Sequence, residues 1–182
     1  MPFFLSEPFI AEICEEFPSF EILPKRTSAL QRAIHVALAV VTIGQMRTYL
    51  TEYHTALFGK LWVPDSWETM GDEERYILLR HERVHLRQRR RMGDVMMAFV
   101  YLVPFFPLGL AYGRARIEWE AYTETIRATA EVKGLAAAKL QRAFIVDRFM
   151  GPDYGWMWPF RRVVQRWFDE VIADLAAESG TS

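Results

Sequence analysis

The chain has 182 residues, of which 51% are hydrophobic, and a formal net charge of −1 at pH 7. This length and composition suffice for a substantial core, so we expect residues 1–182 to form a single domain. The near-neutral charge gives no reason to expect a nucleic-acid partner. Cys14 is the single cysteine, which excludes an internal disulfide. The N-terminal residues lack the basic region of a signal peptide, so we expect a cytoplasmic protein.

The sequence of the first part of the chain predicts two helices that are joined by an extended segment. Residues 6–16 are expected to form a short helix, and residues 18–24 a linker or an irregular strand. Residues 28–50 have a helical pattern, and the apolar run inside it, 33–43, is too short to cross a bilayer alone. His35 lies on that run, where a core histidine is a better interpretation than a metal ligand.

A small hairpin is predicted next. Residues 55–58 and 61–63 alternate as short strands do, the pair Gly59 and Lys60 lies between them, and Pro64 ends the second strand. An edge strand of such a hairpin could pair with the backbone of an extended peptide. A purely structural hairpin is the alternative.

Residues 72–91 carry the pattern that most restricts the function, His81-Glu82-Arg83-Val84-His85, which is an HExxH motif. Acidic residues at the start and arginines at the end of this stretch suit the dipole of a helix. On a helix, His81 and His85 project from one face, one turn apart, and together could hold a Zn²⁺ ion. Glu82 lies about 100° around the helix from His81, where a carboxylate can act as general base on a metal-bound water.

The segment 95–113 contains no charged residue and is long enough to cross a membrane. Pro104, Pro107 and Gly109 argue against one regular helix, so we expect the segment to bend, with most of it buried. Its turn could instead make a peripheral membrane contact, flanked by arginines on both sides.

The remainder of the chain is predicted to be helical. The predicted helices cover residues 114–133, 135–150 and 160–177, with an aromatic loop at 154–159. The strands account for little of the length. The expected fold class is therefore mainly α with a small β-hairpin.

A catalytic zinc site needs a third protein ligand, and no histidine follows His85. Glu120 and Glu124 belong to a charged row at helical spacing, which is typical of a solvated face. Glu118 lies on the other side of the same predicted helix, next to Ile117 and Ala121. We therefore predict Glu118 as the third ligand.

The two motif segments, His81-Glu82-Arg83-Val84-His85 and Glu118-Trp119-Glu120-Ala121-Tyr122, together resemble the gluzincin metallopeptidases, in particular membrane-associated members. The resemblance covers roughly residues 72–92 and 114–126. It implies a zincin-like fold, in which the HExxH helix is followed by a helix that carries the glutamate ligand. Tyr122 stands where those families have an aspartate.

These residues favour a zinc-dependent metallohydrolase, most readily a metallopeptidase that acts on a peptide or protein substrate. Glu82 is the predicted catalytic residue. The predicted zinc ligands are His81, His85 and Glu118. A non-catalytic membrane-associated or regulatory protein that retains a zincin-like fold is the alternative. A di-iron protein would need a second Glu-x-x-His unit, which the sequence lacks. The group that stabilises an oxyanion could be Tyr122, His54, Tyr154 or an arginine. The sequence does not indicate an oligomeric state.

Overall fold

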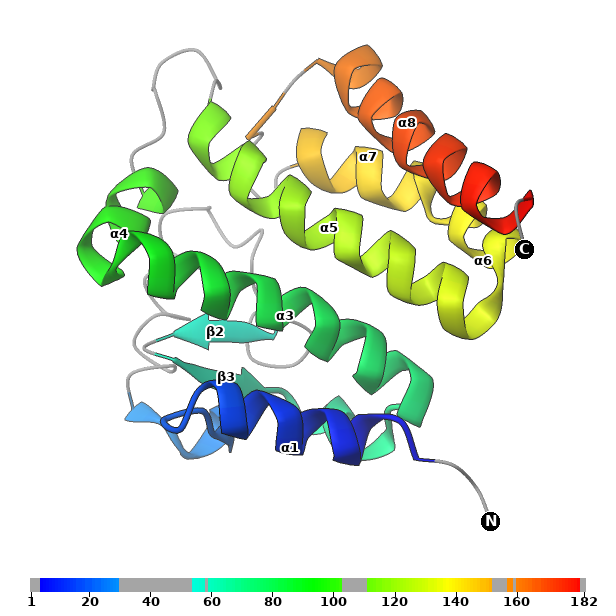
Figure 1. Cartoon of the computed structure of the whole chain (residues 1–182). Helices are drawn as coiled ribbons and strands as arrows, with labels where there is room; N and C mark the ends of the chain where they lie inside the picture. Colours follow the sequence, from blue (N-terminus) through cyan, green and yellow to red (C-terminus); the bar gives the residue numbers. More distant parts are fainter. Residues whose placement is uncertain are drawn as a thin grey trace. The chain divides into compact units, whose positions relative to one another are not determined.

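The computed structural model describes residues 4–29, 54–57, 59–102, 111–151, 157–158 and 160–180. The described chain is mainly α with one small sheet, as the sequence predicted (Figure 1). It divides into two compact units, Met1–Leu86 and Arg87–Ser182, and the boundary falls inside one helix. The single domain expected from the length stays a prediction.

The first unit contains a helix, three short strands and most of the HExxH helix. The elements are α1 (Ser6–Glu16), β1 (Ile22–Pro24), the 3-10 turn η1 (Lys25–Thr27), β2 (Thr55–Leu57), β3 (Lys60–Val63), the 3-10 turn η2 (Asp65–Thr69) and the first part of α3 (Asp72–Met92). The predicted helix at 6–16 and the hairpin are confirmed, since β2 and β3 pair antiparallel around Gly59. The strand order is β1-β3-β2.

The sequence predicted a linker or an irregular strand over residues 18–24, and the structure has a strand, β1, in the last three of these residues only. β1 pairs in parallel with β3, with Leu23 opposite Trp62 and Pro24 opposite Val63. β3 is therefore the central strand. Figure 1 shows α1 and α3 lying alongside this sheet. Apolar side chains of α1, of the sheet, of α3 and of the segments between them form one core. This core comprises Phe9, Ile13, Phe20, Leu61, Val63, Trp67, Leu79 and Leu86.

Polar contacts fix α3 against α1 at two places. Asp72, the first residue of α3, accepts hydrogen bonds from the backbone amides of Leu5 (2.6 Å) and Ser6 (3.1 Å) and from the Ser6 hydroxyl (2.5 Å). The carboxylate of one helix thus caps the N-terminus of the other. Farther along, Arg83 donates to Glu16 at 2.7 Å and lies over the Phe9 ring. Arg83 is therefore part of the contact between α1 and α3.

Substituting Asp72 by alanine is expected to lower the free energy of unfolding by about 1 kcal/mol at neutral pH, because the α1 cap is lost. Burial alone would raise the pKa of Asp72, but the hydrogen bonds from Ser6 and Leu5 outweigh it and hold the pKa below its usual value. The stabilisation is therefore complete above the unfolded pKa of about 3.9 and disappears as the pH falls through the lower folded value.

Urea titrations of wild type and Asp72→Ala across the acid range measure this difference. Asp65→Ala is the matched control, since the ion pair of Asp65 with Arg26 is exposed and should contribute little. A difference between Asp72→Ala and wild type that does not change with pH would show that the carboxylate is not the capping group.

The described residues of the second unit form helices that are joined by short non-helical segments. It contains the end of α3, then α4 (Asp94–Leu102), α5 (Tyr112–Lys133), α6 (Leu135–Leu140), α7 (Arg142–Met150) and α8 (Arg161–Gly180). Buried residues of α5, α7 and α8 form its core, among them Trp119, Ile126, Phe149, Val164 and Phe168. Figure 1 shows these three helices side by side.

The helix predicted over residues 135–150 differs most from the structure. The single helix expected over 135–150 is divided at Gln141 into α6 and α7. The side chain of Gln141 donates to the Thr129 hydroxyl on α5 at 3.0 Å. The buried residues Ala138, Ile145 and Phe149 keep helical spacing across the division, which is why their pattern predicted one helix. The predicted end of the preceding helix, α5, is confirmed, since Gly134 follows Lys133 with a positive φ of 85°.

The apolar segment 95–113 is only partly described. α4 covers its first part, and the predicted turn around Pro104 lies outside the described residues, as do His35 and nearly all of the helix expected over 28–50. A Cβ on Gly113 would lie 2.6 Å from a methyl group of Val100, so the start of α5 approaches α4 closely. In the described part of the chain, no helix combines the length and the apolar character that a membrane span requires.

Candidate metal centre

α3 presents the two histidines of the HExxH motif on one face. The Nε2 atoms of His81 and His85 are 3.1 Å apart, and the ring centroids are 4.9 Å apart. His85 is buried and His81 is half-buried. Two imidazole nitrogens this close direct their lone pairs or protons into a common space, as a pair of metal ligands one helical turn apart must do.

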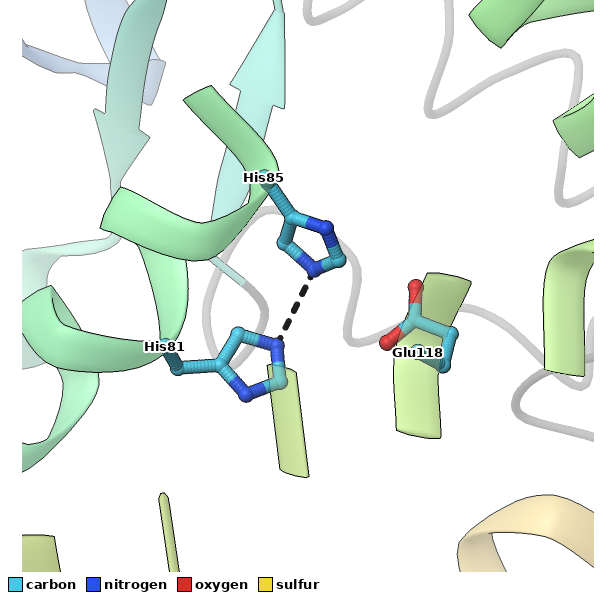
Figure 2. A group of neighbouring side chains, drawn as sticks. All are labelled: His81, His85 and Glu118. Atoms are coloured by element: carbon cyan, nitrogen blue, oxygen red, sulfur yellow. Dashed lines mark hydrogen bonds between the residues drawn. The ribbon is translucent and has the colours of Figure 1, made fainter. Parts of the chain in front are cut away.

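Glu118 is the carboxylate next to this pair. It is 1% exposed, and His81, His85 and Glu118 each offer one ligand atom such that these atoms lie within 4.8 Å of one another. Figure 2 shows the two imidazole rings on α3 and the carboxylate on α5 in one group. These are the three residues that the sequence predicted as metal ligands, and their binding of a metal stays a prediction.

The side chain of Gln88 links the end of α3 to the part of α5 that carries Glu118. The Gln88 side chain is buried and donates from Nε2 to the carbonyl of Ile117 at 3.0 Å and to Glu120 at 2.9 Å. Ile117 is the residue before Glu118, and Gln88 follows His85 by three residues on the same continuous helix. One amide group therefore connects the histidine helix to the backbone beside the predicted third ligand.

Glu120 has a different environment from Glu118. Its side chain is 47% exposed and accepts hydrogen bonds from Gln88 and, at 3.5 Å, from Arg91. The sequence expected Glu120 to point to solvent, and it is exposed, although Gln88 and Arg91 hold it. The two glutamates thus differ in burial as their places on the helix predicted.

The donor set of the group fits a zinc ion. Tetrahedral zinc with ligands at about 2.0–2.2 Å places neighbouring donor atoms roughly 3.3–3.6 Å apart. The separations are 3.1 Å between the imidazole nitrogens and at most 4.8 Å within the group. Two imidazoles and one carboxylate are also the ligand set of a known class of catalytic zinc sites.

Glu82 is 6% exposed, and the reason is a second buried face on α3 that the sequence analysis did not anticipate. Leu79 and Leu86 lie three residues before and four residues after Glu82, and both belong to the core of the first unit. Residues at this spacing share one side of a helix. Glu82 therefore faces the sheet side of the first unit, between two core leucines.

Lys25 is a buried charged residue near Glu82 that the sequence analysis missed. Its side chain is 1% exposed, and burial lowers its pKa to about 7, while the negative charge of Glu82 acts in the opposite direction. Burial and the positive charge of Lys25 lower the pKa of His54 to about 4. In the sequence, nothing distinguishes Lys25 from an exposed lysine at the end of a short strand, since its burial depends on the pairing of β1 with β3.

Two of the candidates for oxyanion stabilisation can be located. Tyr122 is 6% exposed and packs against Phe149 at a ring distance of 5.6 Å, within the core of the second unit. His54 lies against Trp67 in the first unit, with a ring distance of 6.0 Å. Tyr154 lies outside the described residues. The oxyanion group therefore stays open.

Comparison with models of protein families, with curated proteins and with solved structures finds no match to this chain. The resemblance to gluzincins consequently rests on the two motifs alone.

Proposed function

We propose that this chain is a zinc-dependent metallohydrolase of zincin-like fold, and specifically a metallopeptidase. The observation that carries the proposal is the group of His81, His85 and Glu118, whose ligand atoms lie within 4.8 Å of one another, with Glu82 beside His81 on the same helix. A structural role for two core histidines would not require a buried carboxylate from another helix or a carboxylate at the position between them.

His81, His85 and Glu118 would hold the ion. When bound, zinc lowers the pKa of a coordinated water and polarises the substrate carbonyl. Glu82 would accept a proton from the attacking water and donate it to the leaving amine as the peptide C–N bond breaks. Gln88 contributes indirectly, because its hydrogen bond to the Ile117 carbonyl fixes the backbone beside Glu118.

The hairpin supports a peptide as the class of substrate. Among the described residues, β2 has a strand partner on one side only, since β3 is central and β2 lies at an edge. An edge strand offers backbone N–H and C=O groups that an extended peptide can pair with.

The experiment that tests this function combines two measurements on purified protein: zinc content, and cleavage of an unbiased peptide library by the zinc-loaded chain. We expect about one zinc ion per chain and cleavage that is lost in Glu82→Gln. Bound zinc without cleavage would favour the alternative, a regulatory or membrane-associated protein that retains the fold. Absence of both zinc and cleavage would reject the proposal.

We also propose a peripheral membrane contact through α4, in the first part of the segment 95–113. Burial was expected for most of that segment, but Val95, Met96 and Phe99 are 86%, 53% and 62% exposed. The end of α3, just before α4, adds the exposed arginines Arg90 and Arg91. Apolar side chains next to arginines suit an interface with anionic lipid.

A Val95→Ser, Phe99→Ser variant is expected to bind anionic vesicles at least about tenfold more weakly than wild type, because each substitution removes roughly 1.5–3 kcal/mol of apolar burial when the side chain inserts fully. Flotation with vesicles in which about a third of the lipid is phosphatidylserine measures this. Leu140→Ser, Phe144→Ser is the matched control, since both residues are exposed in the same unit. Equal flotation of wild type and both variants would reject the contact.

A further inference from the structure

Gln88 is a buried polar residue near the end of α3 that donates two hydrogen bonds to α5. Its side chain is 2% exposed. The Nε2 atom donates to the backbone carbonyl of Ile117 at 3.0 Å and to the carboxylate of Glu120 at 2.9 Å. Both partners are acceptors, and a glutamine side chain donates only from its nitrogen. The two contacts therefore also fix which way the amide group of Gln88 is turned.

These contacts restrict the rotation of α5 about its own axis. Successive residues of a helix are about 100° apart, so Ile117 and Glu120 lie roughly 60° apart on one side of α5. Glu118 and Glu120 lie roughly 160° apart, on opposite flanks of the helix. A rotation that brings Glu120 toward a given point must therefore take Glu118 away from it. A donor that is bonded to both Ile117 and Glu120 opposes such a rotation.

The donor belongs to the helix that carries the two histidines. Gln88 follows His85 by three residues in α3, which is continuous from Asp72 to Met92. Residues three apart lie on the same side of a helix. Gln88 and its partners on α5 all belong to the second compact unit, so this contact is internal to one folded body. The backbone directly before Glu118 is thus bonded to a point on α3 about one turn beyond His85.

We propose that Gln88 is a positioning residue for Glu118, and that its hydrogen bond to the Ile117 carbonyl determines which glutamate of α5 faces the metal. The proposal rests on the proposed zinc site. Gln88 is not a ligand and touches neither zinc nor substrate. The bond to Ile117 carries the effect because it holds the backbone of α5, whereas the Glu120 side chain is 47% exposed and its contacts contribute little.

The expected consequence is a higher affinity for zinc. A ligand that is already in place loses less conformational freedom when the ion binds. Residues that orient zinc ligands contribute roughly 10- to 100-fold to affinity. Gln88 acts through the backbone and not on the carboxylate itself, so we expect an effect at the lower end of this range.

The first measurement is zinc affinity, by competition with a chromophoric chelator, under conditions in which circular dichroism shows each zinc-free variant to be folded. Gln88→Met keeps the length of the side chain and removes both donors, and it should weaken zinc binding about tenfold. Gln88→Asn keeps the amide on a shorter side chain and should weaken binding at least about threefold. The asparagine variant keeps the test decisive if the methionine variant does not fold.

Gln141→Met is the matched control for a loss of fold stability. Gln141 is also a glutamine of the second unit that donates to α5, but its partner is the Thr129 hydroxyl, about three turns beyond Glu118. Glu120→Ala is the control for the second contact, since it removes one acceptor and leaves the Ile117 carbonyl in place. Both control variants should keep a zinc affinity within about threefold of wild type.

A second measurement shows whether Gln88 acts through Glu118. The zinc affinities of wild type, Gln88→Met, Glu118→Gln and the double variant form a thermodynamic cycle. If Gln88 positions Glu118, Gln88→Met should weaken zinc binding by less than about threefold in the Glu118→Gln background, where the positioned ligand is already lost. A merely structural role of Gln88 would not produce this coupling.

The outcomes separate this inference from the proposed function. A zinc affinity of Gln88→Met within about threefold of wild type would overturn the inference alone, as would an equal loss in Gln141→Met or in Glu120→Ala. A tenfold loss that persists in the Glu118→Gln background would also overturn it, since Gln88 would then act independently of Glu118. Failure of wild type itself to bind zinc would reject the proposed function, and the inference with it.

Discussion

Glu82→Gln is expected to lower the rate of peptide hydrolysis by about 10²- to 10⁴-fold while the protein keeps its fold and its zinc. The amide has the shape of the carboxylate but cannot accept the proton of the attacking water. His81 and His85 are unchanged, so the ligand set stays complete. Glu82 is 6% exposed, and the neutral glutamine is less costly to bury than a carboxylate, so the fold should tolerate the substitution.

The measurement is kcat and KM on a peptide that wild type cleaves, with zinc content determined on the same samples. Glu74→Gln is the matched control, because Glu74 is an exposed glutamate in the first turn of the same helix. Its rate should equal that of wild type. Undiminished turnover in Glu82→Gln would remove Glu82 from the mechanism, and the burial of Glu82 would then have only a structural meaning.

The second large effect is expected at Glu118. Glu118→Gln should weaken zinc binding by more than about a hundredfold, since even the residues that only orient zinc ligands contribute roughly 10- to 100-fold to affinity. Glutamine preserves the volume of a side chain that is 1% exposed. The metal-free variant should therefore be as stable as metal-free wild type, or more stable, because a buried charge is removed.

Competition with a chromophoric chelator measures the affinity, and Glu120→Gln is the control on the same helix. Glu120 is exposed and held by Gln88 and Arg91, so its substitution should change zinc affinity by less than about threefold. The reverse result, with zinc lost in Glu120→Gln and kept in Glu118→Gln, would show that Glu120, on the other face of α5, binds the metal in place of Glu118.

Local patterns in the sequence predicted the elements that carry the candidate site. The charges at the two ends of α3 and the glycine after α5 predicted where these helices lie. Helical spacing predicted that Glu118 and Glu120 lie on different faces of α5. These features depend on residues within one or two turns of each other. The hairpin was predictable for the same reason, because its turn lies directly between its strands.

Features that depend on distant parts of the chain were not predictable. β1 joins β3 across almost forty residues, and this pairing is what buries Lys25. The second buried face of α3, on which Glu82 lies, exists because α1 and the sheet cover it. Arg83 likewise contacts Glu16 only because the two helices pack together. In each case a tertiary contact changed the environment of a residue whose local pattern indicated solvent or gave no signal.

Anomalous X-ray scattering at the zinc edge, from crystals of the zinc-loaded chain, tests the central claim most directly. We predict a single strong peak bonded to Nε2 of His81, Nε2 of His85 and a carboxylate oxygen of Glu118, at about 2.0–2.2 Å from each. A zinc-loaded crystal with no peak between these three residues, or with the ion bound by Glu120 in place of Glu118, would contradict the account.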